Sequence, residues 1–412
     1  MDILFVHGNY PAQFVHLVKS LAASGHHVVF LTARQDADEA WPLAGVEVRK
    51  FSPHRDVSPQ THPYLLSMEE GVLKGQAVVR ELANLSDEGF RPRLAFVHGG
   101  NGLSLFIKHV FPDVRLIAYM EWWFLDKTAR WSWPDYPFDQ RLRTTMRNSI
   151  ILQELEQCDV AVTPTVWQQQ QFPEHYRSKI QVIFDGVDVD FFRPTPVLGD
   201  LVLEGNACDQ PLRIGPNAPL LTYATRGMEP LRGFPQFMRM LPPLLKALPE
   251  LQVVIAGDDR CVYSHPPDRP DGSWKQALLE ELGDQLDSSR VHFTGSLMYR
   301  DYQLLLNRSD LHVYFTRSYV TSWGLFQAAA CGASLMVNRD DATTYVLADD
   351  QACWVDLDSP QQLVQQALSV LNQVTSRRMR IRTSLLKPEW ALKACLEQWQ
   401  DLLNMQLRAA SV

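Results

Sequence analysis

Short apolar runs alternate with helical patterns along the chain, and this alternation constrains the fold more than any other feature. Residues 3–6 are apolar at every position, which is typical of a parallel strand covered on both faces. A helix is predicted over residues 13–23, because Phe14, Leu17 and Leu21 recur at helical spacing. The next predicted strand, residues 27–31, completes a βαβ unit. Later strands are predicted at residues 94–97, 116–119 and 160–162.

The alternation is interrupted once, between residues 188 and 218. This segment contains Pro194, Pro196, Pro211 and Pro216 and has little periodicity, so it is predicted to be an interdomain linker. A second βα series then begins. Its predicted strands are residues 220–224, 252–256, 291–293, 311–315 and 334–337.

The sequence therefore predicts an α/β chain with two doubly wound, Rossmann-like domains that face each other across a cleft. The expected domains are residues 1–190 and 191–388. Residues 389–412 are predicted to form a helix that packs back toward the N-terminal domain. In such sheets ligands bind at the carboxyl ends of the strands.

Composition narrows the class of protein further. The formal net charge of −8 disfavours nucleic acid as a partner. The six cysteines are scattered without a C-x-x-C pair, which predicts neither a zinc site nor a disulfide framework and fits a cytoplasmic protein. The N-terminus is not expected to be a signal peptide, and no run approaches the roughly 20 apolar residues of a membrane span. Membrane contact, at the inner face, is expected to be peripheral if it occurs.

Arg226 and Arg232 form the first candidate site. They lie six positions apart, joined by a loop with Gly227 and Pro230, after a predicted strand. Two such arginines can converge on one anion, and a diphosphate leaving group needs fixed cations or a metal to absorb its developing charge. Asp258-Asp259 and Asp340-Asp341 are adjacent rather than spaced, so no metal site is predicted. The alternative is that both arginines are surface residues of a turn.

A second candidate site joins a predicted strand to a predicted helix at residues 318–332. Thr321 and Ser322 suit the N-cap of that helix, whose N-terminus can bind an anion. The alternative is a capped helix that serves only the core.

Together these segments resemble the C-terminal domain of the retaining GT-B glycosyltransferases of family 4, and the resemblance covers nearly the whole chain. In that family a G-R-x5-K-G type loop follows a strand, and Arg226 and Arg232 occupy its cationic positions. Residues 184–194 (FDGVDVDFFRP) resemble the family's N-G-V-D-x-x-x-F-x-P. Residues 293–297 (FTGSL) and 330–332 (ACG) match two more of its motifs.

One departure concerns the family's E-x7-E motif, whose glutamates fall on Tyr319 and Gln327. Gln327 can still hydrogen-bond a ribose hydroxyl, whereas Tyr319 supplies no negative charge near the sugar at neutral pH. The resemblance implies a donor site with backbone contacts to the base near Ser296 and Leu297. The full set of donor-site residues that it implies is Gly8, Asn9, Arg226, Arg232, Ser296, Leu297, Tyr319, Thr321, Ser322, Trp323, Gly324 and Gln327.

In the N-terminal half, His98 stands at the end of a predicted strand with glycines after it, and the family often has a histidine near the sugar there. It is therefore a candidate catalytic residue beside Arg226 and Arg232, with a core histidine as the alternative. The aromatic-rich stretch that follows contains Trp122, Trp123, Trp131 and Trp133. The candidate acceptor contacts are Tyr10, Glu121, Trp122 and Trp123, although buried aromatics that fill a core are commoner.

The resemblance implies a bacterial-type, retaining, metal-independent hexosyltransferase. Its donor would be a nucleotide diphosphate sugar, UDP-sugar first and GDP-sugar next, and it would need no cofactor. Its acceptor would be a hydroxyl of a saccharide, a lipid-linked compound or a small molecule. The alternatives are a non-catalytic nucleotide-sugar binder and a sugar-nucleotide 2-epimerase of the same fold.

Overall fold

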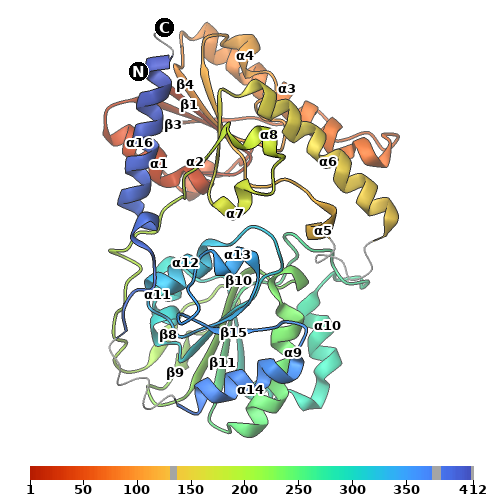
Figure 1. Ribbon diagram of the computed structural model, residues 1–412, viewed down its shortest axis with the longest axis vertical. Helices are drawn as coiled ribbons and strands as arrows, with labels where there is room; N and C mark the ends of the chain where they lie inside the picture. Colours follow the sequence, from red (N-terminus) through yellow and green to blue (C-terminus); the bar gives the residue numbers. More distant parts are fainter. Residues whose placement is uncertain (130–136, 374–381, 410–412) are drawn as a thin grey trace. The chain divides into compact units, whose positions relative to one another are not determined.

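The computed structural model describes residues 1–129, 137–373 and 382–409, which fall into two compact units (Figure 1). Unit 1 comprises residues 1–129, 137–186 and 389–409, and unit 2 comprises residues 187–373 and 382–388. Each unit has a parallel sheet covered by helices on both faces. The predicted pair of Rossmann-like α/β domains is therefore confirmed.

The described strands of unit 1 form one sheet in the order β3-β2-β1-β4-β5-β6-β7, and all neighbouring pairs are parallel. The strands are β1 (Asp2–His7), β2 (His27–Thr32), β3 (Val46–Lys50), β4 (Leu94–His98), β5 (Arg115–Tyr119), β6 (Val160–Thr163) and β7 (Ile180–Val182). The strand order reverses between β1 and β4. This reversal makes the carboxyl ends of these two strands the switch point at which such sheets bind ligands.

Helices cover both faces of this sheet because alternate residues of each strand point to opposite sides. Leu4 and Val6 of β1 face α3 and α6, whereas Ile3 and Phe5 face α1 and α16. The helices are α1 (Val15–Ala23), α2 (Ala37–Ala40), α3 (Leu66–Asp87), α4 (Ile107–Val110), α5 (Asp126–Ala129), α6 (Phe138–Gln157), α7 (Val166–Gln169), α8 (Glu174–Arg177) and α16 (Leu392–Ala409). Short 3-10 helices lie at Ala12–Phe14, Pro63–Leu65 and Pro388–Trp390.

Helix α16, the last helix of the chain, lies beside α1 in unit 1 (Figure 1). Its Trp399 ring packs on Phe96 of β4, with the ring centroids 5.9 Å apart. Leu402 and Leu403 are also buried in this cluster. The C-terminal segment is thus part of the core of unit 1.

The main sheet of unit 2 repeats the same topology. Its order is β12-β11-β10-β13-β14-β15, parallel throughout, with the switch point between β10 and β13. The strands are β10 (Leu220–Gly227), β11 (Gln252–Asp258), β12 (Val291–Gly295), β13 (Leu311–Tyr314), β14 (Leu335–Asn338) and β15 (Cys353–Val355). The helices are α9 (Phe234–Ala247), α10 (Trp274–Leu282), α11 (Tyr299–Arg308), α12 (Trp323–Ala330), α13 (Asp341–Thr344) and α14 (Pro360–Leu371), with 3-10 helices at Pro230–Arg232, Gly283–Gln285 and Ser288–Arg290.

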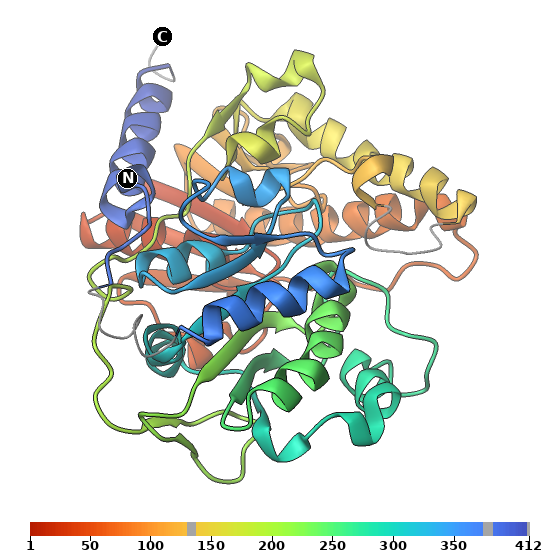
Figure 2. The same ribbon diagram turned by 60° about the horizontal axis from the view of Figure 1, so that its bottom comes forward.

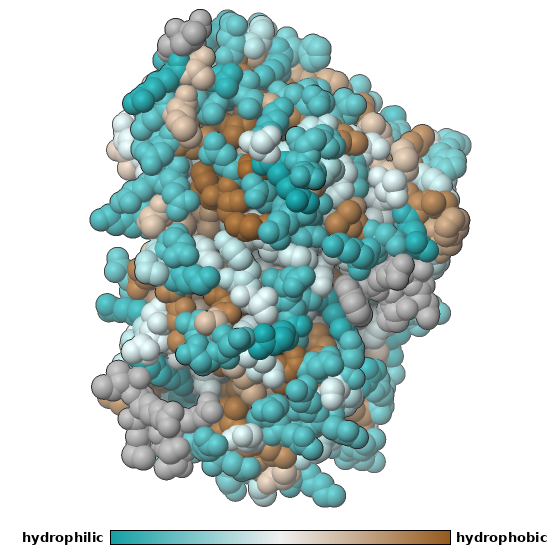
Figure 3. Space-filling view, viewed as in Figure 1, coloured by the Kyte–Doolittle hydropathy of each residue, from teal (hydrophilic) through white to brown (hydrophobic). Residues whose placement is uncertain are grey.

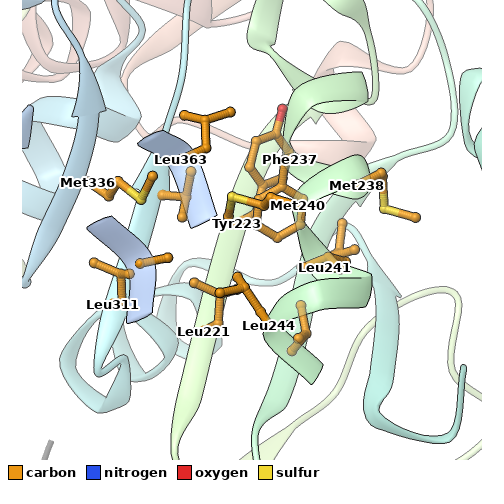
Figure 4. Packing of buried hydrophobic residues seen from close by; sticks show 14 of the residues in the cluster. Leu221, Tyr223, Phe237, Met238, Met240, Leu241, Leu244, Leu311, Met336 and Leu363 are labelled. Carbon is orange, nitrogen blue, oxygen red and sulfur yellow. The ribbon is translucent and has the colours of Figure 1, made fainter. Parts of the chain in front are cut away.

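Helices α9 and α14 lie side by side on one face of this sheet (Figure 2). Figure 4 shows Leu221 and Tyr223 of β10 meeting Phe237, Leu241 and Leu244 of α9. The Tyr223 and Phe237 rings are stacked at 4.6 Å. This packing fixes β10, and hence the loop at its end, against a well-filled core.

The segment predicted as a linker contains an additional element. Strands β8 (Leu201–Leu203) and β9 (Leu212–Ile214) form a two-stranded antiparallel sheet within unit 2. Leu201, Leu203 and Ile214 are buried, so alternation over only three residues per strand is enough to seat the hairpin on the main sheet. The prediction of a linker was therefore wrong for residues 201–203 and 212–214, which form strands.

No described helix is both long enough and apolar enough to cross a membrane. On each unit the face drawn in Figure 3 is mostly hydrophilic, with smaller hydrophobic patches between.

Candidate active site

A small hollow lies at the switch point of unit 2. It is lined by the carboxyl-terminal parts of β10 and β13 and by two residues that the sequence singled out, Arg232 and Ser322. The remaining lining residues are Tyr223, Ala224, Thr225, Val313, Tyr314 and Phe315. The two segments that carry these candidate residues therefore meet at one place.

Arg232 is only 5% exposed and is held in place by hydrogen bonds. Its Nη1 donates to Thr316 Oγ1 at 2.8 Å and to the Val320 carbonyl at 3.1 Å. In the described part of the chain no carboxylate forms an ion pair with this guanidinium, although Glu229 acts on its charge through space. A buried cation without an ion-pair partner is costly, so this position favours an anionic ligand.

Arg226 differs from Arg232 in its surroundings. It is the second-last residue of β10 and is exposed. Among the described residues its side chain has neither a hydrogen bond nor an ion pair. Arg226 is thus available to a ligand at the same strand end.

The turn between Arg232 and α9 depends on Gly233. Its φ is +64°, and a Cβ added there would lie 2.5 Å from Phe315 Cβ. A side chain would meet both the strain of the left-handed conformation and this close approach. Gly233 therefore lets the Arg232 loop press against the end of β13.

The N-terminus of α12 lies beside the same hollow. Ser322 is its N-cap residue, and the Ser322 N–H donates to Tyr314 Oη at 3.0 Å. Thr321, also considered as a cap, instead donates its hydroxyl to the Ala342 carbonyl at 2.7 Å and is buried. Trp323 and Gly324, in the first turn of α12, are half-buried.

The two positions of the family's glutamates have different environments. Tyr319 is half-buried, and its ring lies 5.2 Å from the ring of Tyr263. Gln327 is 9% exposed and shares a hydrogen bond with Tyr299. Gln327 is therefore already held by a neighbour.

The loop between β8 and β9 forms hydrogen bonds with the backbone around Ser296 and Leu297. The Ser296 N–H donates to Asn206 Oδ1 at 2.7 Å, and the Asn206 N–H donates to the Ser296 carbonyl at 3.2 Å. The Ser296 hydroxyl donates to Asp258 Oδ1 at 2.5 Å, and Leu297 forms an antiparallel bridge with Gly205. The hairpin thus borders the edge of the sheet that the resemblance assigns to the base.

At the switch point of unit 1 the polar side chains are linked to one another. The Asn9 N–H donates to His7 Nδ1 at 2.7 Å, so the proton is on His7 Nε2, which donates to Gln13 Oε1 at 2.9 Å. Gln13 Nε2 donates to Glu121 Oε1 at 2.6 Å, and Glu121 Oε2 lies 3.4 Å from His98 Nε2. His98, at the end of β4, packs its ring 4.3 Å from that of His7. Sequence reasoning identified His98 and Glu121 but missed His7 and Gln13 as the residues that join them.

In the glycine-rich loop after His98, backbone N–H groups are hydrogen-bonded to a side chain of the same unit. Glu154 of α6 is fully buried, and its carboxylate accepts the N–H of Gly100 at 2.5 Å and both the N–H and the hydroxyl of Ser104, at 3.1 and 2.9 Å. These backbone donors could otherwise bind a phosphate. Burial raises the pKa of Glu154.

The other predicted site residues of unit 1 differ in their exposure to solvent. Gly8 and Asn9 are exposed, and a Cβ added to Gly8 would meet no atom within 4 Å. Tyr10, Trp122 and Trp123 are buried at 2%, 6% and 9% exposure. These three aromatics fill the core, which was the stated alternative to acceptor contacts. Trp131 and Trp133 lie outside the described residues.

Among the described residues, no group of three histidine, cysteine, aspartate or glutamate side chains could hold a metal ion.

Comparison with known proteins agrees with this architecture. Residues 24–192 match the family model described as glycosyl transferase family 4 group, and residues 236–387 match one described as glycosyl transferase-like. The chain is a glycosyltransferase of the GT-B type. At the level of sequence, no curated protein matches this glycosyltransferase.

Solved structures share the fold of the glycosyltransferase at low identity. Sucrose-phosphate synthase from Thermosynechococcus elongatus has a TM-score of 0.69 and 14% identity, covering 99% of this chain and 100% of that one. A glycosyltransferase from Rickettsia africae has a TM-score of 0.63 and 13% identity, covering 98% of each chain. HepE from Anabaena, solved with UDP and glucose, has a TM-score of 0.61 and 12% identity, covering 98% and 99%.

Proposed function

We propose that this glycosyltransferase moves a hexose-type sugar from a nucleotide diphosphate sugar to a hydroxyl acceptor, with retention of configuration and without a metal ion. The observation that carries the proposal is the buried Arg232, which has no ion-pair partner among the described residues and lies beside the N-terminus of α12. The exposed Arg226 at the same strand end supplies a second cation. Both arginines stabilise the negative charge that grows on the diphosphate as the glycosidic bond breaks.

In the proposed reaction the acceptor hydroxyl attacks the oxocarbenium-like sugar from the face that the diphosphate leaves. The departing phosphate oxygen takes the acceptor proton, so the chain need not supply a base. His98 is proposed to act near the sugar, and Glu121 is proposed to contact the acceptor. The acceptor is a saccharide, a lipid-linked compound or a small molecule, and peripheral contact with a membrane remains part of the proposal.

The preference for UDP-sugars over GDP-sugars is also a proposal. It is supported by the Anabaena HepE structures, which contain UDP, UDP-glucose, or UDP with glucose. The Rossmann-like unit that would hold the donor is common to both proteins.

The test begins with thermal-shift screening of the purified chain against UDP-, GDP- and ADP-sugars with EDTA present, because a ligand that binds the folded state raises its melting temperature. Transfer and donor hydrolysis are then measured, and the anomeric configuration of the product is determined by NMR. Arg226→Ala is expected to abolish most transfer while the fold is retained. Arg213→Ala is the matched control, since Arg213 is also exposed and has no partner among the described residues of unit 2.

The outcomes separate the alternatives. Wild-type turnover in Arg226→Ala would remove the diphosphate assignment. Binding of a nucleotide sugar without transfer or hydrolysis would favour the non-catalytic binder, a hypothesis that rests on Tyr319 and Gln327 standing where carboxylates are expected. An inverted product would overturn the retaining mechanism.

A further inference from the structure

The loop after β11 is anchored by a buried glutamate. Glu229 has no exposed surface, and its Oε2 accepts the backbone N–H of Val262, Tyr263 and Ser264 at 2.9, 2.8 and 2.7 Å. Hydrogen bonds to a charged acceptor are stronger than those between neutral groups. Three of them on consecutive residues fix the conformation of residues 262–264.

The same loop is pressed against the arginine-bearing segment at two more points. The Leu231 N–H donates to Ser264 Oγ at 2.9 Å. A Cβ added to Gly227 would lie 2.6 Å from the Arg260 carbonyl oxygen, so the two backbones approach closely there. Residues 260–264 therefore form a single packed layer with residues 227–232.

This anchoring places Tyr263 at the candidate active site. The Arg232 guanidinium carbon lies 5.3 Å from the centroid of the Tyr263 ring, within the range of a cation–π interaction. The centroid of the Tyr263 ring also lies 5.2 Å from that of Tyr319. Tyr263 is 39% exposed, so part of its ring is open to a ligand.

We propose that Tyr263 is a donor-binding residue whose ring forms a wall against the diphosphate–sugar end of the nucleotide sugar, and that Glu229 is the residue that positions it. The inference rests on the proposed function and deepens it. Tyr263 touches Arg232, the proposed diphosphate ligand, and Tyr319, the residue at the family's sugar-proximal position. An aromatic pair thus stands where the family has a carboxylate, and it recognises the sugar by ring contact rather than by charge.

The experiment measures dissociation constants by calorimetry for UDP-glucose and for UMP, which lacks the second phosphate and the sugar. Tyr263→Ala is expected to weaken UDP-glucose binding about tenfold, the effect of losing one aromatic contact, and to leave UMP binding within about twofold. Tyr263→Phe keeps the ring and is expected to stay within about twofold for both ligands. Trp354→Ala is the matched control, because Trp354 also lies beneath an arginine in unit 2, with Arg339 at 4.8 Å, and is expected to change neither constant.

Each failure has a distinct meaning. If the wild-type chain binds no nucleotide sugar, the proposed function fails. If it binds UDP-glucose and Tyr263→Ala binds equally well, or UMP binding falls in parallel, this inference fails. Tyr263→Leu repeats the loss of the ring if the alanine variant does not fold.

The role of Glu229 is tested by a double-mutant cycle. Glu229→Gln is expected to weaken UDP-glucose binding about threefold to tenfold when Tyr263 is present and to cause no further weakening in Tyr263→Ala. A purely structural role would lower affinity equally in both backgrounds. Additive effects in folded variants would therefore overturn the assignment of Glu229 as the positioning residue.

Discussion

The two units have the same sheet topology but leave different charges at their switch points. In unit 1, β1 and β4 end in His7 and His98, and the polar groups there are joined through Gln13 and Glu121. In unit 2, β10 leads to both Arg226 and Arg232, and Arg232 lies beside the end of β13. Neither arginine has an ion pair among the described residues. A fold that is used twice in one chain thus places histidines beside a glutamate at one switch point. At the other it places two arginines that form no ion pair with the described residues.

Both units fix a neighbouring loop in a similar way. Glu154 in unit 1 and Glu229 in unit 2 are fully buried carboxylates that accept hydrogen bonds from several backbone N–H groups. The contrast between the units therefore lies in the side chains that face the switch point, while the support beneath the loops is shared.

The largest expected effect separates the two arginines of unit 2. Arg226→Ala and Arg232→Ala are both expected to lower transfer about 10²- to 10³-fold, since each removes a cation from the leaving group. Arg232→Ala is also expected to destabilise the chain by about 1–3 kcal/mol, because Thr316 and the Val320 carbonyl lose their partner. Turnover and chemical denaturation measure the two quantities. Equal stability losses in both variants would contradict the difference in burial.

The next effect concerns the support of unit 1. Glu154→Ala is expected to cost about 3 kcal/mol, because buried backbone donors lose their acceptor. The exposed Glu156 of the same helix is the control, and Glu156→Ala is expected to change stability by less than about 0.5 kcal/mol.

Burial raises the pKa of Glu154, so the stability it contributes is complete below its unfolded pKa and falls as the pH rises through the folded pKa. Glu154→Gln is expected to remove this dependence of the free energy of unfolding on pH. If the dependence persists in that variant, another group causes it.

A smaller effect with the opposite pH sign is expected in unit 2. Burial lowers the pKa of His312, which is hydrogen-bonded to Thr222, to about 4. The unfolded chain takes up this proton first, so stability is lost as the pH falls below the unfolded pKa of about 6.5. Between pH 7 and pH 5 the loss is about 2 kcal/mol, and His312→Asn is expected to remove it. Denaturation at both pH values measures the loss, with the exposed His175→Asn expected to behave like the wild type.

The smallest effect on stability is expected at Gly8, in the first loop of unit 1. An added Cβ has open space there, so Gly8→Ala is expected to change the free energy of unfolding by less than about 0.5 kcal/mol. If this loop faces the donor, transfer falls while stability is unchanged. Unchanged transfer would remove Gly8 from the proposed donor site.

The sheets could be predicted from the sequence because their strands are covered on both faces. A strand such as Ile3–Leu4–Phe5–Val6 is apolar at every position, and the helix after it repeats its apolar residues at a fixed interval. Topology then places the ends of β10 and β13 together. For this reason Arg232 and Ser322 could be predicted as neighbours although ninety positions separate them.

Other features had no local pattern. The β8–β9 hairpin has three residues per strand between prolines, which is too short for a periodic pattern to be recognised. Tyr263 lies in a segment rich in proline and glycine that has no helical or strand periodicity. Contacts between residues far apart in the sequence bring it to Arg232, namely those of Glu229 with Tyr263 and of Leu231 with Ser264. Trp122 and Trp123 were candidates for a binding surface, but an aromatic cluster in a sequence does not reveal whether it is buried.

Helix α16 has a consequence for how the chain matures. Unit 1 is discontinuous in sequence, because its core receives Trp399, Leu402 and Leu403 from the last helix. Synthesis proceeds from the N-terminus, so unit 2 leaves the ribosome before unit 1 has all of its core residues. Until the final residues emerge, Phe96 of β4 lacks the Trp399 ring that covers it, and a chain that stops before residue 389 keeps that apolar surface open to aggregation.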